Sequence, residues 1–337
     1  MYNTKKLLSA ILMTVSIFSF AQETKKGQLT ISGSVDAYYQ TNITSSDDLG
    51  QSFGSSFVDQ TGFALGMANA VLSYEGKKTG MVADLAFGSR GVDAIALPNG
   101  ANDFFVNQLY AYWNVSESTT LTLGRFNTYL GYEVISPVGN FNYSTSHLFS
   151  NGPFSHVGLK ADFALSDDFS LMLAVMNVTD VNDNITGEYA LGTQLGYKGQ
   201  YLNFYYDGKA GLGFEVDYTG GFDVSEEFFL GINAAYQNND GAGFYGVALY
   251  PQYSISEDFG LGLRGEYFAD HSDVDGFEST GILGLTLTGS YAVENLTIKP
   301  EVRLDSWGND SEPFQTNADG DMSNSLAAFT LAAIYSF

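Results

Sequence analysis

Residues 296–305 read Leu-Thr-Ile-Lys-Pro-Glu-Val-Arg-Leu-Asp, a stretch in which apolar and polar side chains alternate at every step. Successive side chains of a β-strand point to opposite faces. The stretch therefore predicts a strand with one apolar face and one fully polar face. The apolar positions are Leu296, Ile298, Pro300, Val302 and Leu304, and the polar positions are Thr297, Lys299, Glu301, Arg303 and Asp305.

The same two-residue period recurs along the chain and predicts sixteen strands. Their expected ranges are 28–41, 62–75, 80–90, 104–115, 119–129, 155–165, 169–178, 188–198, 200–207, 212–224, 228–238, 243–254, 259–269, 281–293, 296–305 and 325–337. In 62–75 the apolar residues change parity, which indicates a bulge. Tight turns such as 166–168 alternate with long polar loops such as 42–61. This plan is typical of a transmembrane antiparallel β-barrel with short periplasmic turns and long extracellular loops. The predicted fold class is all-β, with 14 or 18 strands as alternatives to sixteen.

Aromatic residues support the membrane prediction, because they recur eight positions apart on the apolar face of six expected strands. These pairs are Tyr189/Tyr197, Phe214/Phe222, Phe228/Tyr236, Tyr245/Tyr253, Phe259/Tyr267 and Phe329/Phe337. Eight residues span ~26 Å along a strand, or ~20 Å of height at the usual tilt, which is close to the apolar band between two aromatic girdles. A soluble β-sandwich has no reason to repeat this spacing in strand after strand.

The two ends of the chain carry expected export and assembly signals. Residues 1–21 combine Lys5 and Lys6 with an apolar run and small residues before position 22, which predicts a signal peptide for Sec-type export that is cleaved after Ala21. An uncleaved anchor is the alternative, although the apolar run is short for one. The barrel is then expected to span 22–337, in the outer membrane of a Gram-negative bacterium. The last strand carries an expected signal for the barrel-assembly machinery, formed by Phe329, Leu331, Tyr335 and Phe337.

Composition excludes several other functions. The chain has 14 Lys+Arg against 38 Asp+Glu, for a net charge of −24, so binding to nucleic acid phosphates is not expected. It has no cysteine, which excludes disulfides and thiol chemistry. The three histidines, His147, His156 and His271, accompany no nucleophile motif, so we expect no enzyme. No cofactor and no metal site are expected. Expected partners are outer-membrane lipid and lipopolysaccharide, the assembly machinery and small polar solutes. A homotrimer is compatible with the architecture, but no sequence feature specifies one.

A sixteen-stranded barrel is too wide for its own side chains to fill, so a water-filled lumen is expected. Charges of both signs occupy the inward parity, and a transverse field between them would favour polar solutes. The alternative for any one of these charges is that it forms a salt bridge with another inward charge and has no role in selectivity. The candidate pore-lining residues are Asp36, Asp84, Arg90, Lys160, Asp162, Glu215, Asp217, Arg264, Glu266, Lys299, Glu301 and Arg303.

The longest connector, 130–154, is rich in Phe and Tyr and has Glu133 as its only formal charge. A loop in open water would carry more charge, so we expect this one to fold into the lumen and narrow it. An Ω-loop packed on the outer rim is the alternative. The candidate constriction residues are Glu133, Phe141, Tyr143, His147 and Phe149.

Several motifs resemble a known family. They are Gly124-Arg-Phe-Asn-Thr128, Gly131-Tyr-Glu133, Asn140-Phe-Asn-Tyr-Ser144, Pro153-Phe-Ser-His-Val-Gly-Leu-Lys160 and Gly33-Ser-Val-Asp-Ala-Tyr-Tyr39. Together they are similar to the OmpL-like β-barrel porins of Gram-negative outer membranes. The resemblance implies a porin. We therefore expect a passive diffusion channel for small polar solutes, with size exclusion at 130–154 and a mild cation preference from the net acidity. The alternative is a non-conducting barrel whose loops bind a partner or support the envelope.

Overall fold

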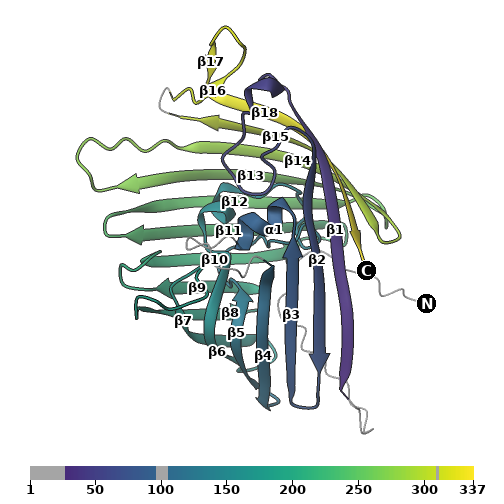
Figure 1. Cartoon of the computed structure of the whole chain (residues 1–337), viewed down its shortest axis with the longest axis vertical. Coiled ribbons are helices and arrows are strands. Elements are labelled where there is room, and N and C mark those ends of the chain that lie inside the picture. The colour runs from purple at the N-terminus through teal and green to yellow at the C-terminus, as the bar shows by residue number, and fades with distance from the viewer. Residues whose placement is uncertain (1–26, 96–104, 309–310) are drawn as a thin grey trace.

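The chain forms a closed barrel of sixteen antiparallel strands in the computed structural model, which describes residues 27–95, 105–308 and 311–337 (Figure 1). The first strand pairs with the last, as in the contact of Ser34 with Ser336, so the sheet has no open edge. The prediction of sixteen strands is confirmed, and the alternatives of 14 and 18 are wrong. The predicted signal peptide, 1–21, lies outside the described residues. Within those residues, no helix is both long and apolar enough to cross a bilayer.

The strands follow the predicted ranges closely. They are β1 (Gln28–Asn42), β2 (Gly62–Glu75), β3 (Thr79–Phe87), β4 (Val106–Ser116), β5 (Thr119–Asn127), β6 (Ser155–Ala164), β7 (Phe169–Asn177), β8 (Tyr189–Tyr197), β9 (Gln200–Tyr206), β10 (Phe214–Asp223), β11 (Phe228–Asn239), β12 (Ala242–Ser254), β13 (Phe259–Ser272), β14 (Ile282–Val293), β15 (Leu296–Trp307) and β18 (Ser325–Ser336). The loops hold η1 (Asp47–Leu49), α1 (Ser89–Ile95), α2 (His147–Asn151) and the small hairpin of β16 (Phe314–Gln315) and β17 (Met322–Ser323).

Alternation sets the two faces of the wall. In β15, Lys299, Glu301 and Arg303 are buried inside the barrel, whereas Val302 and Leu304 are each 42% exposed on the outside. The outer face also carries three of the six predicted aromatic pairs with both side chains exposed, namely Tyr189 with Tyr197, Phe214 with Phe222 and Tyr245 with Tyr253. Each of the other three pairs has one exposed and one partly exposed ring. Since a lipid-facing surface is apolar and bears aromatic girdles, the outer face is the one that contacts the membrane.

The predicted bulge in β2 is present. Register along β1 shifts between Val35 and Ala37, which leaves an extra residue on β2. Phe63 is 92% exposed on one side of the shift and Tyr74 is exposed on the other, so the outward parity changes across it. The inserted residue frees a backbone amide, and the Asp36 carboxylate accepts a hydrogen bond of 2.8 Å from the N–H of Met67.

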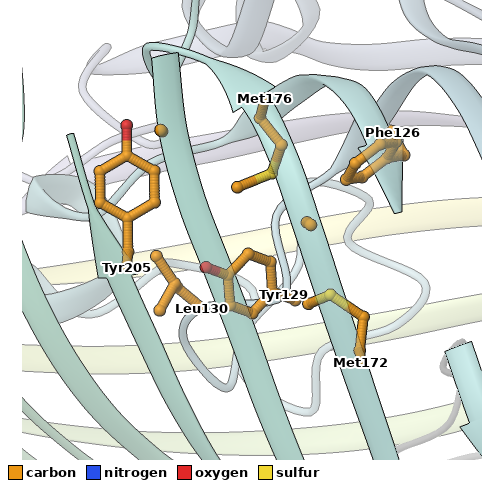
Figure 2. Close-up of a cluster of buried hydrophobic side chains, with 8 residues drawn as sticks. Phe126, Tyr129, Leu130, Met172, Met176 and Tyr205 are labelled. Atoms are coloured by element: carbon orange, nitrogen blue, oxygen red, sulfur yellow. The ribbon is translucent and has the colours of Figure 1, made fainter. Parts of the chain in front are cut away.

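The buried side chains lie inside the barrel, where loops pack onto the wall. One apolar cluster joins Phe126 of β5, Met172 and Met176 of β7 and Tyr205 of β9 to Tyr129 and Leu130 (Figure 2). Tyr129 and Leu130 begin the connector between β5 and β6. This connector therefore enters the barrel as soon as β5 ends.

Candidate constriction site

The backbone of the 130–154 loop donates to carboxylates on three different strands. The amide of Gly131 donates to Asp217 on β10, at 3.0 Å, and the amide of His147 donates to Glu266 on β13, at 2.8 Å. On β15, Glu301 accepts from two successive loop amides, at 2.7 and 3.0 Å. These carboxylates thus satisfy backbone groups that the irregular loop cannot pair within itself.

Cations of the wall and of α1 bind the carbonyl groups of the same loop. Arg264 donates to the carbonyl of Ser144 at 2.6 Å and Arg303 to that of Thr145 at 3.0 Å. Lys299 donates to the carbonyls of Pro137 and Asn140, and Arg90 donates to those of Ile135 and Tyr143. Inward charges of both signs therefore hold the loop by its main chain.

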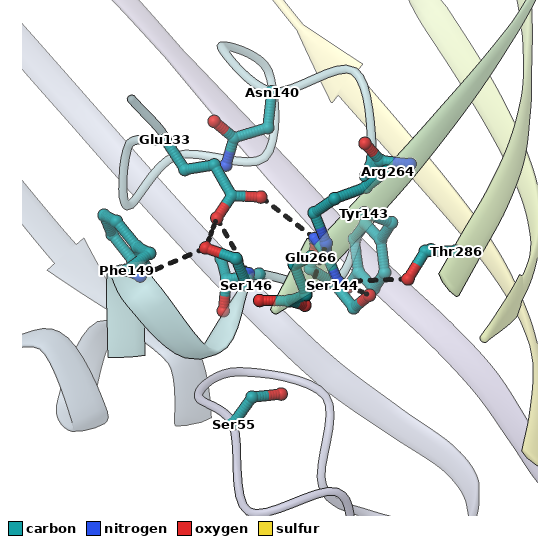
Figure 3. Close-up of polar contacts among 12 residues, drawn as sticks. Ser55, Glu133, Asn140, Tyr143, Ser144, Ser146, Phe149, Arg264, Glu266 and Thr286 are labelled. Atoms are coloured by element: carbon teal, nitrogen blue, oxygen red, sulfur yellow. Dashed lines mark hydrogen bonds and ion pairs between the residues drawn. The ribbon is translucent and has the colours of Figure 1, made fainter. Parts of the chain in front are cut away.

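An ion-pair cluster lies where α2 meets the wall (Figure 3). Arg264 is 2.9 Å from Glu133 of the loop and 3.3 Å from Glu266, and Arg303 is 2.6 Å from Asp305. The Glu133 carboxylate also accepts from the amide and hydroxyl of Ser146. Burial raises the pKa of Glu133, and the nearby Arg264 guanidinium opposes that shift. A buried charge with one partner removed is strongly destabilising, so the members of this cluster depend on one another.

The predicted pore-lining residues divide into two groups. Asp36, Asp84, Arg90, Glu215, Asp217, Arg264, Glu266, Lys299, Glu301 and Arg303 are buried. Only Lys160 and Asp162 of this set are partly exposed, at 23% and 31%, and they form an ion pair of 3.0 Å. One placement was wrong: Arg90 is not on the third strand but in α1. Gly88 adopts φ 92° after β3 and turns the chain into that helix.

The predicted constriction residues also meet the wall or its neighbours. The hydroxyl of Tyr143 donates to Asp36, and His147 lies 2.7 Å from Asp305. Phe149 packs against Phe57, with ring centroids 5.8 Å apart. The ring of Phe141 lies over Gly262 of β13, where a Cβ would come within 2.3 Å of it. Glu133, as described above, pairs with Arg264.

Sequence reasoning missed a second inward segment, residues 53–58 of the first long loop. Its Ser55 hydroxyl accepts from Arg303 at 2.6 Å, and the carbonyl of Ser56 accepts from the Thr145 hydroxyl at 2.9 Å. Phe53 and Phe57 are each at most 3% exposed. These two phenylalanines in a polar loop were the available signal. Nowhere in the described ranges do three His, Asp or Glu side chains gather as a metal site.

Comparison with known proteins places the chain in a family. The model of the family described as "Putative beta-barrel porin-2, OmpL-like" matches residues 28–337. The chain belongs to this family. It is therefore an outer-membrane porin of the Gram-negative type, and the resemblance inferred from the motifs is confirmed. No curated protein matches the chain.

Solved porins share the fold at low sequence identity. The outer membrane channel DcaP of Acinetobacter baumannii has a TM-score of 0.57 and 16% identity, over 94% of this chain and 100% of that one. An anion-selective porin from Comamonas acidovorans gives 0.58 and 9%, over 93% and 100%. The trimer form of OmpT from Vibrio cholerae gives 0.55 and 9%, over 93% and 100%.

Proposed function

We propose that small polar solutes diffuse passively through this porin and that the 130–154 loop sets the size limit. The observation that carries the proposal is the attachment of the loop backbone to inward charges of β10, β13 and β15. A segment fastened on several strands stays in the lumen while solutes pass beside it. Family membership favours transport over catalysis.

Net acidity supports a mild cation preference, because rings of acidic groups attract cations to a pore. The chain carries 38 acidic residues against 14 basic ones. We further propose Sec-type export and assembly through the outward-facing Phe329, Leu331, Tyr335 and Phe337 of the C-terminal end. Contact with lipopolysaccharide at the extracellular loops and a homotrimeric state complete the proposal. The OmpT structure from Vibrio cholerae is a trimer form, and the shared fold supports the same state for this chain.

A specific observation favours the alternative of a closed barrel that acts through its loops. Buried apolar clusters lie on several sides of the 130–154 loop. One contains Ile135 and Phe149 with Met67 of β2, another contains Leu148 with Phe244 of β12, and a third contains Tyr143 with Tyr38 of β1. Such packing would resist the passage of larger solutes.

Two measurements separate these functions. Folded protein in planar bilayers is expected to give ohmic single-channel steps, and liposomes that contain it should swell in small sugars but not in larger ones. If heat-modifiable, folded protein gives neither conductance nor swelling, the channel proposal is wrong. Adhesion that depends on the loops would then support the closed barrel.

A further inference from the structure

The strongest unassigned feature is an apolar groove on the outer wall, over strands β2 to β6. Its volume is about 520 Å³, which lies within the ~300–1,000 Å³ range of small-molecule sites. Strands β2, β3 and β4 run side by side at this place (Figure 1). Lipid hydrocarbon surrounds this face of a transmembrane barrel.

The strand register explains why the wall is hollow here. One cross-strand row contains, in order, Tyr74, Met81, Ala111, Leu123 and Leu159. Ala111 is the short side chain in the middle of this row of large ones. The next row toward the turns brings Trp113 beside Leu121. The groove is therefore a gap left by Ala111 and bordered by two aromatic side chains, Tyr74 and Trp113, at the level of the turns.

Two lysines stand directly beside the groove. Lys77 and Lys78 lie in the turn between β2 and β3, next to Tyr74 and Thr79, and both are exposed. Every other Lys or Arg in the described part of the chain has a protein partner, whereas these two have none. Five of these residues form ion pairs: Lys160 with Asp162, Lys198 with Asp168, Lys209 with Asp240, Arg264 with Glu133 and Arg303 with Asp305. Lys299 and Arg90 donate to backbone carbonyls. Arg125 donates to the carbonyl of Asn107 and to the side chain of Asn182.

One other short turn, 198–199, is basic, but its Lys198 pairs with Asp168. The other short turns are acidic, which contrasts with the position of Lys77 and Lys78. These turns carry Glu117, Asp167, Asp168, Glu226, Glu227, Glu257, Asp258 and Glu294. An acidic rim repels anionic headgroups, whereas a pair of free lysines attracts them. Each basic residue near an anionic membrane surface strengthens binding by about fivefold.

We propose that this groove binds an anionic phospholipid of the periplasmic leaflet, with an acyl chain over Ala111 and the phosphate at Lys77 and Lys78. The groove supplies apolar contact along the chain, and the aromatic border lies at the depth where Tyr and Trp meet headgroups. The turn supplies the only unpaired cations among the described residues. The lipid would hold the β2–β4 wall at a defined depth in the membrane.

Trp113 provides a direct probe of the site. Its fluorescence is measured in vesicles of phosphatidylcholine that contain an equal fraction of either brominated-chain phosphatidylglycerol or brominated-chain phosphatidylcholine. The other tryptophan, Trp307, contacts His147 and Phe314 inside the barrel and gives a constant background. We expect phosphatidylglycerol to quench Trp113 with at least about threefold higher apparent affinity.

Variants identify the two parts of the site. The double variant Lys77→Gln/Lys78→Gln is expected to abolish the preference, and Lys77→Arg/Lys78→Arg is expected to keep it. Ala111→Phe fills the groove and should also abolish it. The matched controls are Lys198→Gln, on another short turn, and Ala333→Phe, at a small outward position of β18, and both should leave it unchanged.

Three outcomes would overturn the proposal. One is equal quenching by the two brominated lipids in the unmodified protein, and another is a preference that persists in the Lys77→Gln/Lys78→Gln variant. The third is protection of Trp113 from both lipids together with cross-links between copies across this wall, because a second copy would then cover the groove. None of these readouts depends on conductance, so they are independent of the channel proposal.

Discussion

At Glu301, a single carboxylate fixes the middle of the loop to β15. It is 1% exposed and accepts from the amides of Tyr143 and Ser144 and from the hydroxyl of Thr288. Glu301→Gln replaces one acceptor oxygen with an NH₂ group that would face a donor. We expect this change to weaken loop docking by about 1.5–3 kcal/mol, the contribution of a hydrogen bond to a charged group. Hydrogen exchange of residues 140–147 should then rise by at least tenfold.

The control for this prediction is Glu257→Gln, which removes a carboxylate from an exposed turn. It should leave exchange in the loop at the level of the unmodified protein. Single-channel recordings of Glu301→Gln should also show noisier or larger steps. Unchanged exchange in Glu301→Gln would show that Glu301 does not hold the loop.

Asp180 offers a test of pH dependence outside the spanning strands. Its carboxylate accepts from the amides of Phe154 and Ser155 and from the Ser155 hydroxyl. Burial raises its pKa above the unfolded value, despite these bonds. The contribution of a group with a raised pKa is fully present below the unfolded value, about 3.9 for Asp, and is lost as pH rises through the folded pKa.

Asp180→Asn cannot ionise, and Asn tolerates the left-handed backbone at this position, where φ is 60°. The temperature of the heat-induced gel shift should therefore increase for Asp180→Asn relative to that of the unmodified protein as the pH is raised from 4 to 7. Asp180→Ala loses the acceptor oxygen and should be less stable than the unmodified protein by about 1–3 kcal/mol at both pH 4 and pH 7. A constant difference between Asp180→Asn and the unmodified protein across this range would contradict the assignment.

At the scale of elements, the strand pattern was readable because it is local. Alternation over 296–305 is enough to place Lys299, Glu301 and Arg303 on the inner face of β15, where the structure has them. Their partners could not be read in the same way. The bond from Tyr143 to Glu301 joins residues 158 positions apart, and no periodicity encodes such a contact. The helix at Arg90 was missed because Gly88 ends β3 before the apolar pattern does.

The β2 bulge gives a prediction at this scale. A Cβ on Gly66 would lie 1.7 Å from the Asp36 carboxylate that accepts from the bulge amide. Gly66→Ala must therefore displace Asp36, which leaves the Met67 amide and the Tyr143 hydroxyl without their acceptor. We expect the free energy of unfolding to fall by at least about 2 kcal/mol, because each buried donor left unpaired costs about 1–3 kcal/mol.

The matched control is Gly265→Ala on β13, where a Cβ would meet nothing within 4 Å. The temperature of the heat-induced gel shift reports both variants. Gly66→Ala should lower it by several degrees, and Gly265→Ala should leave it unchanged. Equal temperatures for the two variants would show that Asp36 can move without loss.

For the whole molecule, the negative charge has more than one location, and these locations respond differently to salt. The loops and turns carry exposed acidic groups in open water. The field of these groups extends over a screening length of ~10 Å at 0.1 M salt and only ~3 Å at 1 M. Inside the barrel, most of the predicted pore-lining charges are buried, and many of them bind the loop. Lys160 and Asp162 remain as a partly exposed pair that a solute can approach.

Ion selectivity should therefore have two contributions. The exposed acidic groups contribute a part that salt screens, and the Lys160–Asp162 pair determines the part that remains at high salt. In KCl gradients near 0.1 M, the reversal potential should indicate a preference of the channel for K⁺ over Cl⁻. In gradients near 1 M, this preference should fall toward zero. At 1 M, Lys160→Gln leaves Asp162 unpaired and should restore a K⁺ preference, whereas Asp162→Asn should shift the preference toward Cl⁻. Lys198→Gln removes the same charge from a pair that is more than half exposed at a turn and should have no effect at 1 M. If Lys160→Gln and Asp162→Asn shift the potential in the same direction, solutes do not pass this pair and the route lies elsewhere in the barrel.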